Sequence, residues 1–375
     1  TQIDGSSYTI SATSYDVPTL GSRVAGDLNS APDPSFIGKK INDIFFHRNR
    51  LGVLADENVI MSRSGEFFEF FPETVTSALD TDPIDVASTH TKVSILQHAV
   101  SFDEELLLFS EQSQFMVTGG ATLTASNISI NVTTEFEADK KVKPVGSGSN
   151  VFFTFNKGNF SGVREFFVAS DTDTKKADDI TANVPKFVPA NVFKLATSTT
   201  ENILIALSSD EDNALYVFQY YVAQNKRLQS AWHKWTYGTS TSDKILNIDF
   251  IENTLFIVNE RSDGVYLESI DVSPALTDSG ETYLTHLDRK INNTQLTESY
   301  NAGTNQTTLT LPYAINNNMK VVGRSGASNK AGQEIATVSQ SGTSIVVTGD
   351  ITAQNFFVGE QYEFEFQFSQ QFIQV

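Results

Sequence analysis

Short apolar runs separated by turn-forming residues recur along the whole chain. Examples are residues 44–46 (IFF), 106–109 (LLLF) and 215–220 (LYVFQY), and Gly, Asn, Asp or Ser lie between such runs. Runs of this kind are typical of β-strands, whereas an amphipathic helix would repeat its apolar positions every three to four residues. Abundant Phe, Tyr, Thr, Val and Ile favour strands as well. The pattern predicts an all-β fold of short antiparallel strands.

The strand-like runs also recur with a loose period. They begin near Lys40, Lys92, Lys140, Asn191 and Lys244, so the successive spacings are 52, 48, 51 and 53 residues. Three or four strands repeated about every 50 residues are typical of β-propeller blades. One blade cannot bury both of its faces, so several must pack around an axis. The alternative is a set of unrelated hairpins in a sandwich.

The pattern changes after Pro274. Further strands follow without the period, and the cleanest alternation in the chain lies near its end, with aromatic and polar residues on opposite sides: Tyr362, Phe364, Phe366 and Phe368 against Glu363, Glu365 and Gln367. Such alternation predicts a strand with one buried and one wet face. By the same argument, in residues 67–71 (FFEFF) we expect Phe68 and Phe70 to be buried and Phe67 to be less buried.

These patterns suggest three parts. We expect residues 1–36 to be an N-terminal arm, the remnant of a truncated preceding region. Residues 37–275 should form a β-propeller domain. Residues 276–375 should form a smaller β-rich domain, a barrel or a sandwich, that is incomplete at its C-terminus.

The charge and cysteine content limit the possible functions. The chain has 26 Lys and Arg against 45 Asp and Glu, a net charge of −19, and no Cys. Tight binding of nucleic acid needs cations that displace counterions from phosphates, so the chain is a poor candidate for gripping DNA. Without Cys there is no disulfide framework and no thiolate zinc site. No apolar run is long enough for a transmembrane helix, and the first residues lack a signal-peptide pattern.

No set of residues with the spacing of a catalytic or metal site can be found. The five His residues are scattered singly, residues 146–148 (GSG) lack the spacing of a phosphate-binding loop, and there is no GxSxG motif. Adjacent carboxylates such as Glu104 and Glu105 face different ways and do not form the opposed pair of a glycosidase. We therefore expect no catalytic residues, no metal site and no cofactor.

One basic cluster, His47-Arg48-Asn49-Arg50, interrupts the acidic sequence. It could contact phosphate or an acidic partner surface. The structural alternative is that its arginines pair with carboxylates across a hairpin, for example with Asp56 and Glu57.

The region around this cluster resembles a known family. Residues 46–52 (FHRNRLG), 57–60 (ENVI) and 82–85 (DPID), followed by two tryptophans, resemble in order the tail tubular protein B, or nozzle protein, family of short-tailed bacteriophages of the autographivirus type. The match is dense from about residue 34 to 238 and returns weakly at residues 287–290 (LDRK) and 359–372. The residues that carry it, which we interpret as structural, are Asn49, Arg50, Leu51, Gly52, Glu57, Asn58, Asp82, Pro83, Asp85, Trp232 and Trp235.

The resemblance implies a non-catalytic structural protein of the virion tail, made in the host cytoplasm. Members form a homohexameric ring below the gatekeeper ring of tail tubular protein A, help to anchor tail fibres, and enclose the path of the ejected double-stranded DNA without binding it specifically. The family fold includes a β-propeller, in agreement with the repeat. Members are substantially longer than this chain, and no membrane insertion is expected of this segment.

Two other functions stay open from the sequence. One is a receptor-binding or adhesive module, which would usually trimerise. The other is a propeller hydrolase that acts on glycans, although residues 62–68 (SRSGEFF) only loosely resemble the Asp-containing turn of sialidases and do not repeat.

Overall fold

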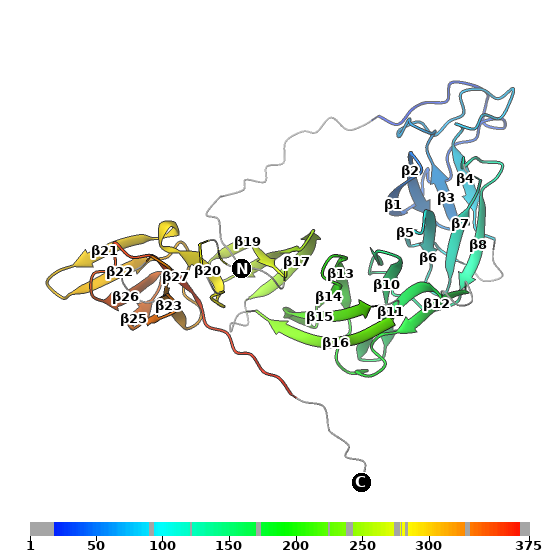
Figure 1. The fold of residues 1–375 in the computed structure, drawn as a ribbon. Helices are drawn as coiled ribbons and strands as arrows, with labels where there is room; N and C mark the ends of the chain where they lie inside the picture. Colours follow the sequence, from blue (N-terminus) through cyan, green and yellow to red (C-terminus); the bar gives the residue numbers. More distant parts are fainter. Residues whose placement is uncertain are drawn as a thin grey trace, which may run out of the picture. The chain divides into compact units, whose positions relative to one another are not determined.

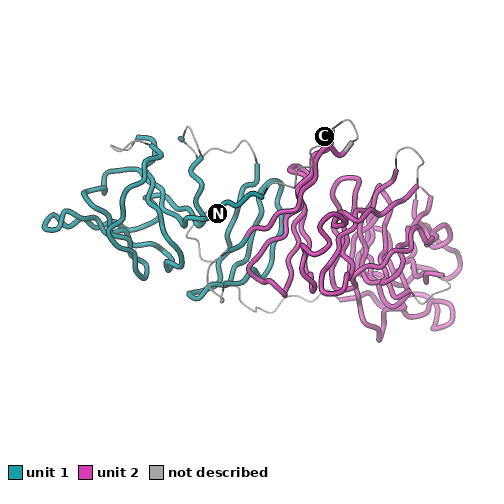
Figure 2. Tube along the Cα trace, turned by 90° about the horizontal axis from the view of Figure 1, so that it is seen from below, with its two compact units in different colours: residues 1–10, 236–375 teal, residues 11–235 magenta. Residues whose placement is uncertain are grey.

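The computed structural model describes residues 19–89, 94–120, 122–169, 174–223, 226–237, 243–273, 278, 280–281, 284–326 and 331–367 (Figure 1). Antiparallel strands dominate these residues, and the helical structure among them is limited to a single 3-10 turn, η1 (Asn293–Gln295). The prediction of an all-β fold is confirmed. The chain divides into two compact units. In chain order, we call residues 11–235 the first unit (magenta, unit 2 in the key of Figure 2) and residues 236–375 the second unit (teal, unit 1 in the key).

The first unit contains four four-stranded sheets, each an antiparallel meander in chain order. The first sheet comprises β1 (Ile41–His47), β2 (Arg50–Ala55), β3 (Asn58–Met61) and β4 (Ile84–Ala87). The second comprises β5 (His98–Phe102), β6 (Glu105–Phe109), β7 (Gln114–Thr118) and β8 (Ser129–Thr134). The third comprises β9 (Val145–Ser147), β10 (Asn150–Lys157), β11 (Phe160–Ala169) and β12 (Thr174–Asp179). The fourth comprises β13 (Val192–Ser198), β14 (Ile203–Ser208), β15 (Glu211–Ala223) and β16 (Lys226–Thr236).

These sheets are blade-like, as the period predicted. The sheets begin close to the predicted repeat starts, and the largest offset is at the second sheet, which begins at His98 and not near Lys92. The first strands of successive sheets, β1, β5, β9 and β13, contact one another in order. Such contacts between innermost strands are typical of blades arranged around an axis.

Apolar residues fill the spaces between neighbouring sheets of the first unit. One cluster joins Leu54 and Met61 of the first sheet to Leu108 and Phe115 of the second. Equivalent clusters lie between the second and third sheets and between the third and fourth. A fully buried Leu or Phe side chain contributes roughly 1.5–3 kcal/mol, so the stacking of blades supplies the core that a single blade lacks.

The second unit begins with a sheet of three strands, β17 (Lys244–Ile251), β18 (Thr254–Arg261) and β19 (Gly264–Asp271). Two four-stranded sheets follow and pack face to face as a small sandwich. Their strand orders are β20-β27-β23-β24 and β21-β22-β26-β25. The strands are β20 (Asp288–Asn292), β21 (Thr297–Asn301), β22 (Gln306–Thr310), β23 (Met319–Gly323), β24 (Glu334–Ile335), β25 (Thr337–Ser341), β26 (Ser344–Thr348) and β27 (Phe356–Glu360). The expected division at residues 36/37 and 275/276 stays a prediction.

Two local predictions were wrong. Phe70 is buried and Phe67 is exposed, as expected, but Phe68 is 42% exposed. Residues 67–71 form no strand, because a turn around Gly65 (φ 79°) and an isolated bridge between Arg63 and Glu66 precede them, so the period of two does not apply. Residues 361–367 also form no strand and are exposed, since β27 ends at Glu360. Phe368 lies outside the described residues.

Candidate functional sites

The basic cluster forms the turn of the β1–β2 hairpin. Its two central residues, Arg48 and Asn49, have φ angles of 46° and 61°. Both therefore lie in the left-handed region that a two-residue turn of type I′ requires, and Asn tolerates that region well. The turn is tied to neighbouring loops, because the Asn49 carbonyl accepts a hydrogen bond from the Gly65 N–H at 2.9 Å. Arg48 Nη1 donates to the Gly120 carbonyl at 2.7 Å.

Arg50 is the central residue of this region, and its side chain is only 1% exposed. The guanidinium donates hydrogen bonds to loop carbonyl oxygens at 2.7, 2.7, 2.8 and 3.2 Å, those of Ser62, Asp82, Asp80 and Leu123. Burial lowers the pKa of Arg50, while the nearby Asp82 carboxylate raises it. The side chain therefore acts as a clamp on three loop segments.

Neither sequence interpretation of the basic cluster holds for Arg50. Both Nη1 and Nη2 of this guanidinium donate to loop carbonyl oxygens, and the residue is only 1% exposed, so Arg50 does not present its charge to phosphate. The proposed acidic partners are also engaged elsewhere: Asp56 pairs with Lys39 at 2.9 Å, and Glu57 accepts a hydrogen bond from the Ser94 N–H at 3.1 Å.

The next two motif residues, Leu51 and Gly52, follow Arg50 in β2. Gly52 lies directly under the ring of Phe45, and a Cβ atom at this position would come within 2.1 Å of that ring. Only glycine allows this close approach of backbone and ring. The Leu51 N–H donates to the Ser62 hydroxyl at 3.1 Å, and the Leu51 side chain packs against the small cluster around Phe70.

The remaining acidic and amide residues of the motif fix loops to the first sheet. Asn58 Nδ2 donates to Asp85 Oδ1 at 3.0 Å, and the other oxygen of Asp85 accepts from the Ser35 N–H at 2.8 Å. Asp82 Oδ2 accepts from the Leu79 N–H at 2.7 Å. Pro83 lies immediately before β4, where its missing N–H costs no ladder hydrogen bond.

The two tryptophans lie on the same edge strand, β16, in different surroundings. Trp232 donates its indole N–H to the Ile180 carbonyl at 3.0 Å and packs against Phe218, with a ring-centroid distance of 5.1 Å. Trp235 contacts the ring of His233, with centroids 5.7 Å apart. Residues three apart on a strand face opposite sides, so only Trp232 belongs to the core between sheets.

A buried ionic network in the second unit was missed by the sequence analysis. Arg261 Nη2 lies 2.9 Å from Glu268 Oε1, and Arg289 Nη1 lies 3.1 Å from Glu360 Oε1. Arg289 Nε is 3.8 Å from the same oxygen of Glu268 and so links the two pairs. The guanidinium of Arg289 also lies over the Tyr313 ring at 3.9 Å. These contacts join the three-stranded sheet to the sandwich.

The backbone explains how Arg289 reaches this position. Its φ is 46°, and the pairing of β20 with β27 is irregular between Asp288 and Ile291. A bulge of this kind redirects a side chain out of the ladder. In the sequence, only the family resemblance at residues 287–290 pointed to this region. The sequence does not show that positions 261, 268, 289 and 360 lie together.

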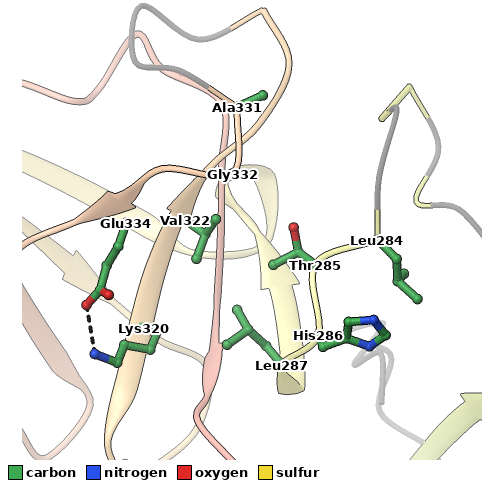
Figure 3. Close-up of a pocket in the computed structure, with 9 residues that line it drawn as sticks. All are labelled: Leu284, Thr285, His286, Leu287, Lys320, Val322, Ala331, Gly332 and Glu334. Carbon is green, nitrogen blue, oxygen red and sulfur yellow. Dashed lines mark hydrogen bonds and ion pairs between the residues drawn. The ribbon is translucent and has the colours of Figure 1, made fainter.

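The hollows of the molecule include one of about 560 Å³ beside the β1–β2 turn, which is lined by Arg48, Arg50, Ser64, Glu104, Thr122 and Leu123. Another, of about 490 Å³, lies on the outer face of the sandwich and is lined by Leu284, Thr285, His286, Leu287, Lys320, Val322, Ala331, Gly332 and Glu334 (Figure 3). Lys320 and Glu334 pair with each other at 2.8 Å. Among the described residues, no three His, Cys, Asp or Glu side chains are grouped to hold a metal ion. Nor does that part of the chain contain a helix able to cross a membrane.

Comparison of the sequence with known proteins shows that this chain is related to a family of bacteriophage proteins. The model of the bacteriophage nozzle protein family matches residues 5–375. Tail tubular protein gp12 of Escherichia phage T7 is 34% identical over 289 residues, which cover 76% of this chain and 36% of that protein. The chain thus spans little more than a third of the length of this relative.

Similarity to solved structures is weak. Hsv2 of Kluyveromyces lactis is 10% identical with a TM-score of 0.35, and 75% of this chain and 92% of that one are covered. The extracellular domain of a putative hybrid two-component system of B. thetaiotaomicron is 8% identical with a TM-score of 0.40. The similarity covers 79% of this chain and 37% of that one. Scores this low support no argument about this chain.

Proposed function

Because the chain belongs to the bacteriophage nozzle protein family, we propose that it is a non-catalytic structural subunit of the phage tail, within the tube through which DNA leaves the virion. The observation that carries this proposal is the family match over residues 5–375, together with 34% identity to a tail tubular protein of phage T7.

The contacts of the motif residues support a structural role. The side chains of Arg50 and Asp82 bond to loop backbone, and Asp85 accepts hydrogen bonds from the Ser35 N–H and the Asn58 amide. Gly52 and Trp232 contribute to packing. We therefore assign the eleven motif residues to the rigidity of the blades and of the loops between them.

The finer proposal concerns assembly. Copies of the protein form a closed ring, a homohexamer, since a heterologous interface whose rotation closes gives a ring. The ring lies below the gatekeeper ring of tail tubular protein A and helps to anchor tail fibres. Residues 37–275 are its propeller domain and residues 276–375 a smaller β domain.

The charge of the chain fits a conduit for DNA. Each phosphate contact inside the tube would have to break as the duplex slides, and a net charge of −19 in every subunit disfavours such contacts. The arginines of the basic cluster do not change this, because Arg50 is buried and Arg48 bonds to a backbone carbonyl.

Mass photometry of the protein, alone and with gatekeeper rings, tests the assembly. We expect a species of six copies in at least one of the two samples. A monomer in both samples would contradict the ring. Fluorescence anisotropy with a labelled duplex tests the conduit: submicromolar affinity at about 150 mM salt would contradict passage without binding.

A further inference from the structure

Two acidic residues lie opposite each other across the β20–β27 pair of the sandwich. Asp288 is paired directly with Glu360 in the register of these strands. Directly opposite residues of an antiparallel pair lie on the same face, with Cβ atoms about 4.5–5.5 Å apart, and like charges at such positions repel each other. Glu360 is buried and Asp288 is half-buried, so the repulsion is weakly screened. Such a pair favours the binding of a proton.

The surroundings raise the pKa of both carboxyl groups. For Glu360, burial is the largest cause of the higher pKa and the charge of Asp288 adds to it, against the opposing charges of two arginines. Burial also raises the pKa of Asp288, and the charge of Glu268 adds to this effect. Two carboxyl groups that interact this closely lose their protons in two separate steps that belong to the pair. The second of these protons is therefore released above the ordinary range of a glutamate.

The pair lies at the junction between the three-stranded sheet and the sandwich. On the sandwich side, the guanidinium of Arg289 balances one of the two carboxylates, and the other remains in excess. On the sheet side, Arg261 balances Glu268 at 2.9 Å, and the buried Asp243 and the exposed turn residue Asp263 remain in excess. Burial works to lower the pKa of Arg261, but carboxylates from both sides of the junction, Glu268 first, raise it. When both members of the pair are ionised, each side thus carries excess negative charge.

The lysines of the neighbouring strands do not offset this excess. Lys290 of β20 pairs with Asp278 at 2.6 Å. Lys320 of β23 lies on the other face of its strand, because its neighbour Met319 is the residue opposite Glu360. Three tyrosines also face the pair or its arginine, and since burial raises the pKa of each, they stay neutral: Tyr266, Tyr313 and Tyr362.

We propose that Asp288 and Glu360 share one proton, and that this proton is a latch between the three-stranded sheet and the sandwich. With the proton bound, the sandwich side of the junction is neutral, and the contacts of Arg289 with Glu360 and Glu268 hold the two parts together. Without it, both sides carry excess negative charge and the junction loosens. This stabilisation is fully present below the ordinary glutamate pKa of 4.5 and is lost as the pH rises through the raised pKa of the pair.

Amide hydrogen exchange in β19 and β20, corrected for the intrinsic effect of pH on exchange, tests the latch. As the pH rises from about 4.5 to about 9, protection in the wild type should fall by at least about tenfold, the factor that one unit of pKa difference supplies. In the Asp288→Asn and Glu360→Gln proteins the fall should shrink to less than about threefold, because a single carboxyl group has no partner with which to share a proton.

Glu334→Gln is the matched control for these two variants. It removes an exposed carboxylate, the partner of Lys320, from the same sheet of the sandwich without touching the junction. Its exchange should keep the pH response of the wild type.

Infrared titration of the wild type does not depend on how well the variants fold. The band of one protonated carboxyl group should persist at pH values at which exposed Asp and Glu side chains have already ionised. This late band should be absent from the Asp288→Asn protein.

Three results would overturn the latch. The first is wild-type protection in β19 that stays constant or increases as the pH rises. The second is a fall of wild-type size in both variants. The third is an infrared titration in which every carboxyl group of the wild type ionises in the ordinary range, and this result decides the question if neither variant folds. The proposed tail function does not depend on the latch, since assembly and DNA binding test it separately.

Discussion

Replacement of Arg50 by Met should destabilise the first unit strongly. Met keeps the apolar stem of the side chain and removes every N–H donor. Four loop carbonyls, which now accept hydrogen bonds at 3.2 Å or less, would then lose a charged donor in a site that is 1% exposed. At about 1 kcal/mol per lost bond, with water replacing some of them, the free energy of unfolding should fall by about 2–4 kcal/mol.

Two further substitutions control for other effects. Arg48→Met, in the exposed turn, removes the same charge and should cost less than about 1 kcal/mol. Arg50→Lys keeps the charge, but a single ammonium group with three donors cannot reach four carbonyls in three loop segments, so an intermediate loss is expected.

Urea denaturation followed by tryptophan fluorescence is the appropriate assay, because both tryptophans of the chain lie in the first unit. Equal midpoints for the Arg48→Met and Arg50→Met proteins would refute the reasoning. They would show that the carbonyls find water as readily as the guanidinium.

Three other perturbations follow from the structure. Burial lowers the pKa of His98, so the folded state resists protonation of this side chain and its stability should fall as the pH drops below about 6.5. The urea midpoints at pH 7.5 and 5.5 should therefore differ less in the His98→Asn protein than in the wild type. Arg289→Met leaves the buried Glu360 carboxylate without its cation, while Glu268 keeps Arg261, and should cost about 3–5 kcal/mol, measured by hydrogen exchange in the second unit; a loss below about 1 kcal/mol would contradict a role in joining its sheets. Gly52→Ala forces a Cβ against an aromatic ring and should lower the thermal midpoint, whereas Gly146→Ala, where the nearest atoms are 3.8 Å away, should not.

The sequence predicted the repeated sheets well because a blade is a local structure. Its strands follow one another in the chain, so alternation and turn residues carry most of the information. The hairpin at Arg48 and Asn49 is of this kind, since its turn is set by two adjacent residues.

Long-range features were not predictable in the same way. Phe68 was expected to be buried because an alternating pattern assumes a strand, but the turn at Gly65 gives this segment another path. The Arg289 network joins positions that are far apart in the chain, and a bulge at Arg289 delivers the side chain. The alternation at residues 361–367 predicted a half-buried strand, but β27 ends at Glu360 and these residues are exposed, because an alternating pattern does not show which sheet would receive the strand.

The location of the protein in the virion tests the central claim most directly. Purified phage particles, labelled with an antibody against residues of the first unit and viewed by electron microscopy, should carry the label on the tail. Absence of the protein from purified virions, or label confined to the capsid, would contradict a structural role in the tail.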